Sequence, residues 1–79
     1  MTPYEAYCQA RNQGYGTPEQ EAVIATYARF SYYYARDVIK GRFPLCETII
    51  AKTDWWEYYL NDVPMSEEYR VMLTLKYHA

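Results

Sequence analysis

The residue types that most often carry out catalysis are few in this chain and do not cluster. The only histidine, His78, is the penultimate residue of the 79, and the two cysteines, Cys8 and Cys46, fit neither a disulfide scaffold nor a metal site. Paired acids occur at 19–21 and 67–68, where first helical turns are expected and the helix dipole favours negative charge. We therefore expect no enzyme activity, no metal and no cofactor.

A basic and aromatic stripe is the first arrangement suited to binding. At about 100° per residue, Arg29, Arg36 and Lys40 fall on one side of a helix over residues 28–40, with Tyr33 beside them. Such a stripe contacts acidic protein surfaces, or grips phosphates while a ring stacks on a base. It also suits a solvated face or salt bridges within the chain, so these interpretations stay open.

A run of aromatic residues over 55–59 is the second arrangement. Trp55, Tyr58 and Tyr59 share one helical face, whereas Trp56 points elsewhere and is expected to fill a junction inside the protein. Tryptophan and tyrosine are enriched where proteins bind one another. We predict that Trp55, supported by Tyr58 and Tyr59, contacts a partner protein or a second copy of this chain.

Composition indicates one small domain over residues 1–79 and weakens the case for nucleic acid. The net charge is −2, and eleven of the hydrophobic residues are tyrosines, which suit core edges and interfaces. Residues 1–26 carry a net charge of −2, residues 27–52 carry +3 and residues 53–79 carry −3. A nucleic-acid partner is therefore the least favoured of the alternatives, because a strong binder of polyanions is usually basic overall.

No membrane contact is expected either. The N-terminus lacks a charged stretch followed by a hydrophobic run, and no segment approaches the roughly 18 apolar residues of a membrane span. The sequence thus predicts a cytoplasmic protein with reduced thiols.

The chain repeats itself, with a shift of 25 that becomes a shift of 26 further along. Residues 7–11 return as residues 32–36 at a shift of 25, and residues 18–25 return in part as residues 44–51 at a shift of 26. Continued further, the shift of 26 carries Arg29 onto Trp55, which predicts an exposed Trp55. A period of this length is typical of stacked helical units. We expect about three units, at 3–26, 28–52 and 54–77, arranged like an α-solenoid.

Capping signals set the expected helices. Thr2 and Thr17 each precede proline and lie three residues before Glu5 or Gln20, which predicts two capping boxes, and Asp54 and Ser66 are further expected N-caps. Glycine or proline marks the expected ends. The fold class is therefore all-α, with helices at about 3–13, 18–26, 28–40, 44–52, 54–62 and 67–77; the second and third of these are either continuous or bent near Tyr27.

Segment 30–52 resembles a short tyrosine-rich tandem repeat found in many uncharacterised proteins of bacteriophages and bacteria. The resemblance is close over these residues and partial over 7–28 and 53–62. It rests on Tyr32, Tyr33, Tyr34, Ala35, Arg36, Asp37, Val38, Ile39, Lys40, Gly41, Arg42, Phe43 and Pro44, followed by Glu47, Ile50, Ala51 and Lys52. It implies an α-helical repeat of phage or bacterial origin and no catalytic residues.

The leading hypothesis is a small phage-type protein that binds a host protein, such as a defence factor, and inhibits or redirects it in the host cytoplasm. One alternative is a structural or self-assembling repeat protein that forms homo-oligomers. The other is a nucleic-acid-binding accessory protein that uses the basic and aromatic helix face.

Overall fold

The structure, a computed structural model, describes residues 1–78 and, among these, the side chains of residues 1–77. This part of the chain contains six α-helices, one π-helical turn and no strand, so the all-α prediction is confirmed. The elements are α1 (Pro3–Gln13), α2 (Pro18–Ile24), α3 (Ala28–Tyr34), η1 (Ala35–Ile39), α4 (Pro44–Ile50), α5 (Trp55–Asp62) and α6 (Glu67–His78).

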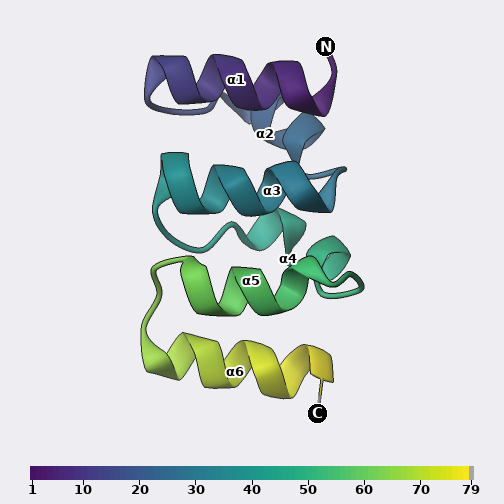
Figure 1. The fold of residues 1–79 in the computed structure, drawn as a ribbon, viewed down its shortest axis with the longest axis vertical. Coiled ribbons are helices and arrows are strands. Elements are labelled where there is room, and N and C mark those ends of the chain that lie inside the picture. Colours follow the sequence, from purple (N-terminus) through teal and green to yellow (C-terminus); the bar gives the residue numbers. More distant parts are fainter. Residues whose placement is uncertain (79) are drawn as a thin grey trace.

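One row of helices forms a front layer, and the remaining helices lie behind it (Figure 1). The layer is ordered α1, α3, α5, α6; α2 and α4 form the connections behind it. Helices α1, α3 and α5 run in the same direction and α6 runs opposite to them. The stack measures 35 × 21 × 18 Å. That the units form a solenoid stays a prediction.

Most of the expected helix starts are confirmed. Thr2 and Thr17 both form complete capping boxes, and the Ser66 hydroxyl accepts the Tyr69 N–H at 3.2 Å. Asp54 occupies the N-cap position of α5, as expected, but its backbone is helical and its side chain makes no capping hydrogen bond. The Thr53 hydroxyl instead accepts the Trp55 N–H at 3.2 Å.

Helices α2 and α3 are separate, with the boundary near Tyr27. Tyr27 has extended backbone angles (φ −133°, ψ 113°), so it interrupts the helical path. The buried Ser31 hydroxyl donates a 2.8 Å hydrogen bond to the Ile24 carbonyl oxygen at the end of α2. The same carbonyl also accepts the Tyr27 N–H at 3.1 Å, so the Ser31 hydroxyl adds a second bond that fixes α3 against the end of α2.

The π turn η1 explains why the shift of the repeat changes from 25 to 26 residues. In α1, Gly14 is left-handed (φ 87°) and its N–H donates to the carbonyl of Ala10, four residues back. In η1, Lys40 is left-handed (φ 58°) and its N–H donates to the carbonyl of Ala35, five residues back. Ala10 and Ala35 are related by the shift of 25, whereas Gly14 and Lys40 are related by the shift of 26. The extra residue is therefore accommodated inside the widened turn.

A tightened turn at the start of α5 restores the shift of 25. The Ser31 N–H donates to the Tyr27 carbonyl four residues back, whereas the Trp56 N–H donates to the Thr53 carbonyl only three residues back. The shift of 26 thus ends at Thr53. Extending it through α5 was wrong, and the counterpart of Trp55 is Phe30 rather than Arg29.

Hydrogen bonds between the predicted units follow the same register. Four tyrosine hydroxyls each donate to a carboxylate of a neighbouring unit, at 2.5–2.9 Å: Tyr7 to Asp37, Tyr32 to Asp62, Tyr34 to Glu21 and Tyr59 to Glu47. The first two donors are related by the shift of 25, as are the last two. At each of the two contacts between neighbouring units, one bond is donated by a tyrosine of the earlier unit and the other by a tyrosine of the later unit.

The core lies between the layer and the helices behind it. The predicted equivalence of Ile24 and Ile50 agrees with their burial, since neither is exposed to solvent. Gly16 is required by close packing, because a Cβ atom there would lie 1.9 Å from the Tyr34 hydroxyl. Tyrosine side chains thus occupy space that aliphatic residues fill in most small domains.

Candidate functional site

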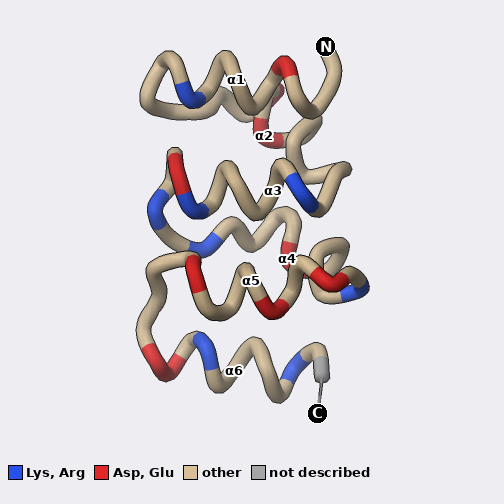
Figure 2. Tube along the Cα trace, viewed as in Figure 1, with Lys and Arg blue, Asp and Glu red and all other residues tan. Residues whose placement is uncertain are grey.

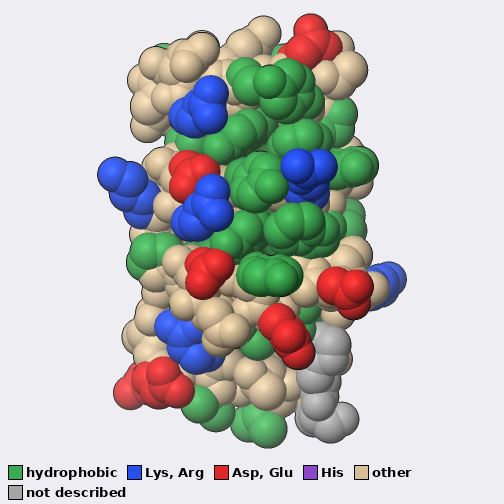
Figure 3. All heavy atoms as spheres, viewed as in Figure 1, with side chains coloured by type: hydrophobic (Ala, Val, Ile, Leu, Met, Phe, Trp, Pro, Cys, Tyr) green, Lys and Arg blue, Asp and Glu red, His purple; other side chains and the backbone are tan. Residues whose placement is uncertain are grey.

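Eight aromatic rings form a continuous surface across α1, α3 and α5, with Tyr27 just before α3. Each contacts at least one other at a centroid distance of 5.2–6.1 Å. This aromatic face comprises Tyr4, Tyr7, Tyr27, Phe30, Tyr32, Tyr33, Trp55 and Tyr58. Figure 3 shows hydrophobic side chains gathered over α1, α3 and the upper part of α5, with basic side chains at their borders.

The aromatic face is open to solvent at its edge and buried at its base. Tyr4, Tyr27 and Tyr58 are 59%, 50% and 54% exposed, whereas Tyr7 and Tyr32 are buried. Burial and the hydrogen bonds to Asp37 and Asp62 raise the pKa of Tyr7 and Tyr32. Large exposed apolar patches on small proteins are often interaction sites.

Arginine side chains cover part of this face. The Tyr33 ring lies between two guanidinium groups, with the Arg29 Cζ 5.6 Å and the Arg36 Cζ 5.2 Å from its centroid. Arg29 Nε also donates to the Tyr33 hydroxyl at 3.1 Å, and Arg11 lies over Tyr7 at 5.5 Å. Cation–π contacts of this kind hold the guanidinium groups against the rings. The predicted grouping of Arg29, Tyr33 and Arg36 is therefore present.

The two central arginines differ in how their charge is balanced. Arg36 forms a two-point ion pair with Asp37, at 2.7 and 2.9 Å. This pair raises the pKa of Arg36 and lowers that of Asp37. Arg29 takes part in none of the three ion pairs of the described residues. Its charge is thus available to a partner, whereas that of Arg36 is largely used within the chain.

Lys40 was expected to extend the stripe but lies outside the helical spacing that predicted it. It is exposed and caps η1 in a left-handed conformation. The rule of 100° per residue applies to an uninterrupted α-helix, and the π turn comes between Arg36 and Lys40. The stripe on α3 and η1 therefore consists of Arg29, Tyr33 and Arg36.

An open groove of about 770 Å³ adjoins the aromatic face where the start of α3 meets the turn between α4 and α5. Tyr27 and Trp55 contribute rings to its lining, Arg29 and Lys52 contribute positive charge and Asp54 one negative charge. The groove thus combines apolar walls with a net positive charge, which suits a carboxylate on a side chain that enters between the rings.

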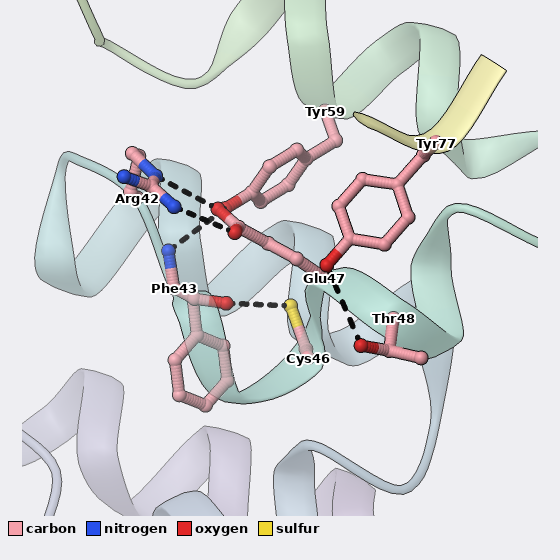
Figure 4. Close-up of polar contacts among 7 residues, drawn as sticks. All are labelled: Arg42, Phe43, Cys46, Glu47, Thr48, Tyr59 and Tyr77. Carbon is pink, nitrogen blue, oxygen red and sulfur yellow. Dashed lines mark hydrogen bonds and ion pairs between the residues drawn. The ribbon is translucent and has the colours of Figure 1, made fainter. Parts of the chain in front are cut away.

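Tyr59 was predicted to support a contact surface, and the structure corrects this. Its side chain is fully buried. The hydroxyl accepts the Phe43 N–H at 2.8 Å and donates to Glu47 Oε2 at 2.7 Å (Figure 4). Burial is the main reason that the pKa of Tyr59 is raised. The wrong register caused the error, because the true counterpart of Tyr59 is the buried Tyr34.

The carboxylate of Glu47 is the centre of this buried network. Glu47 is 3% exposed, and Arg42 donates to both of its oxygens, at 3.0 and 2.8 Å. Arg42 also lies 4.7 Å from the ring centroid of Tyr69 on α6. The network therefore links α4 and α5 (Figure 4), and the contact of Arg42 with Tyr69 extends it to α6. The Glu47 carboxylate and the Tyr59 hydroxyl at its centre are buried in the fold rather than arranged around a substrate.

Neither tryptophan is exposed, although the sequence suggested that Trp55 would be. Trp55 is half-buried and packs against Tyr32, Tyr33 and Tyr58 at 5.4–5.9 Å. Trp56 is buried, as expected, and stacks on Tyr59. The expectation that Trp55 is exposed was wrong, because its counterpart Phe30 occupies the same half-buried place one unit earlier.

Five members of the aromatic face were not predicted from the sequence as contact residues: Tyr4, Tyr7, Tyr27, Phe30 and Tyr32. A usable signal was present, because the shift of 25 carries Phe30 and Tyr33 onto Trp55 and Tyr58. Applied from the start, that shift groups the rings of α3 with those of α5.

Within the described residues, no three His, Cys, Asp or Glu side chains are grouped so that they could hold a metal ion. Nor is any helix of this part long and apolar enough to cross a membrane. No protein-family model, curated protein or solved structure matches the chain.

Proposed function

We propose that this chain is a small interaction protein with no chemistry of its own, and that the aromatic face binds a partner protein. The observation that carries the proposal is the continuous ring surface of α1, α3 and α5, half-exposed and bordered by Arg29. Rings and arginines are the residue types that contribute most at protein interfaces. They are also rigid or held in place here by cation–π contacts, so little conformational entropy is lost on binding.

The partner presents an acidic side chain among apolar ones. Arg29 is not paired with a carboxylate of the described residues, and Lys52 lies in the same groove. Following the resemblance to phage and bacterial repeats, the partner is a host protein, such as a defence factor, that the chain inhibits or redirects. A nucleic acid fits less well, because Arg36 and Asp37 neutralise each other at the centre of the stripe.

Affinity capture from a bacterial host lysate tests the proposal when matched variants are compared. Tyr27→Ala with Tyr58→Ala removes two exposed rings, and Tyr15→Ala is the control, since Tyr15 is 62% exposed but lies in the turn between α1 and α2. We expect the double variant to retain at least tenfold less of the partner and the control to equal the wild type. Equal capture by both variants would refute the proposal, as would salt-sensitive binding to DNA or RNA with no protein partner.

Trp55→Ala is a poorer probe than the sequence suggested. Because Trp55 packs on three rings, its truncation is expected to cost roughly 1–3 kcal/mol of stability, which would mix unfolding with lost binding. Tyr27 and Tyr58 avoid this difficulty, since about half of each side chain is already in water.

A further inference from the structure

Helix α6, at one end of the layer, has an uncovered apolar side. Val71, Met72 and Leu75 are 50%, 43% and 63% exposed, whereas Leu73 on the opposite side is 1% exposed. At 100° per residue the three exposed residues share a stripe that continues to Glu68 at the start of the helix. Figure 3 shows hydrophobic side chains along the lower edge of the molecule, where α6 lies.

Helix α1, at the other end of the layer, has the polar outer side that is expected of a helix exposed to water. Apart from Tyr4, which belongs to the aromatic face, the exposed residues of α1 are polar: Glu5, Gln9, Arg11, Asn12 and Gln13. A terminal helix of a stack needs a polar outer side to stay soluble. The side of α1 meets this condition and the side of α6 does not.

We propose that the outer side of α6 pairs with α6 of a second copy of this chain, the two helices antiparallel. Pairing with α1 of another copy is disfavoured, because α1 offers polar side chains to an apolar stripe. An antiparallel pair centred on Met72 is self-complementary. Glu68, four residues before the centre, then faces Lys76 of the other copy, four residues after it, and the helix dipoles oppose each other.

Charge supports this register through Glu68 and Lys76. Figure 2 shows acidic residues at the start of α6, a basic residue beside them and a second basic residue toward the other end. The first of these basic residues is Arg70, which pairs with Glu67 at 3.4 Å, so the charge of Glu67 is balanced within the chain. In an antiparallel pair Glu68 of each copy meets Lys76 of the other, whereas a parallel pair places Glu68 against Glu68. The helix is only about 18 Å long, and the contact is smaller than the ~1,600 Å² of a standard stable complex. The dimer is therefore weak and is expected to form only at high protein concentration.

Sedimentation analysis of the whole chain over a concentration series, from about 10 µM to about 1 mM, tests the pairing. The mass should rise from the 9.5 kDa of one chain toward twice that value. Leu75→Glu should weaken dimerisation at least tenfold. Leu45→Glu is the matched control, because Leu45 is 59% exposed on α4, and it should leave dimerisation unchanged.

A charge exchange tests the register independently of the apolar contact. Glu68→Lys should weaken the dimer, and adding Lys76→Glu should restore it, because each pair then has opposite charges again. A mass of 9.5 kDa at every concentration would overturn the proposal. So would equal effects of Leu75→Glu and Leu45→Glu, or a failure of the second charge change to restore the dimer.

Discussion

The tyrosine–carboxylate bonds allow one substitution to be compared at two counterpart sites. Tyr59→Phe removes a hydroxyl that makes two buried hydrogen bonds, one to the Phe43 N–H and one to the Glu47 carboxylate. Tyr34→Phe removes a single bond to Glu21, which is half-buried. The ring remains in both variants, so packing is retained and the difference reports on the hydrogen bonds.

The expected magnitudes follow from the partners. A neutral hydrogen bond contributes about 0.5–1.5 kcal/mol and one to a charged group about 1.5–3 kcal/mol, so Tyr59→Phe should cost about 2–4 kcal/mol. Water can replace the hydroxyl at Glu21, and Tyr34→Phe should cost about 1–2 kcal/mol. A domain of this size is stable by roughly 4–12 kcal/mol. The first substitution therefore removes a large share of the total.

Urea unfolding followed by circular dichroism measures both variants, and thermal melting gives a second readout. At about 4–8 °C per kcal/mol for a domain of this size, Tyr59→Phe should lower Tm by roughly 10–25 °C and Tyr34→Phe by roughly half as much. Equal losses, or a larger loss for Tyr34→Phe, would show that the buried network around Glu47 contributes no more than a half-exposed bond, and the reasoning would be refuted.

Three further predictions concern stability. Ile24→Ala and Ile50→Ala should each cost about 2–5 kcal/mol in urea unfolding, because both side chains are fully buried; unchanged midpoints would contradict their place in the core. The pKa of Asp37 is held below its ordinary value of 3.8 by Arg36 and Tyr7, so its contribution is present above that pH and is lost as the pH falls through the folded-state pKa; Asp37→Asn should flatten this loss in melting curves taken across acidic pH. Burial raises the pKa of Cys46 from 9.0 to about 12, so between these values the unfolded chain releases a proton that the folded chain keeps; since the pKa of buried Tyr59 is raised as well, Tm should fall as the pH rises through this range, and Cys46→Ala should make the fall smaller, whereas an unchanged fall would argue against the burial of the thiol.

Local signals in the sequence were enough to predict the helices. Thr2 and Thr17 are followed by proline and by an acceptor side chain three residues later, and these contacts depend on a few neighbouring residues only. Asp54 carries a similar signal, yet its side chain makes no capping hydrogen bond, because Thr53 supplies the hydroxyl and the turn into α5 is tighter than a regular helical start.

The register of the repeat could not be predicted from one shift, because the shift changes twice along the chain, from 25 to 26 in η1 and back to 25 at Thr53. The extra residue in η1 and the shortened turn at Thr53 leave no mark in composition. This is why the position of Trp55 was wrong and Tyr59 was placed on the surface. The stripe of Arg29 and Arg36 was predictable, since both lie before the widened turn is complete.

The π turn also shows how a repeat protein can accept a change of length without losing its packing. Ala35 is the counterpart of Ala10, and Lys40 is the counterpart of Gly14. Both units therefore have the same buried alanine and the same left-handed residue at the helix end, with one more residue between the two in the second unit. The wider turn therefore accommodates one additional residue within a helix rather than in a loop. Neighbouring units can then differ in length while their tyrosines still donate hydrogen bonds to counterpart carboxylates.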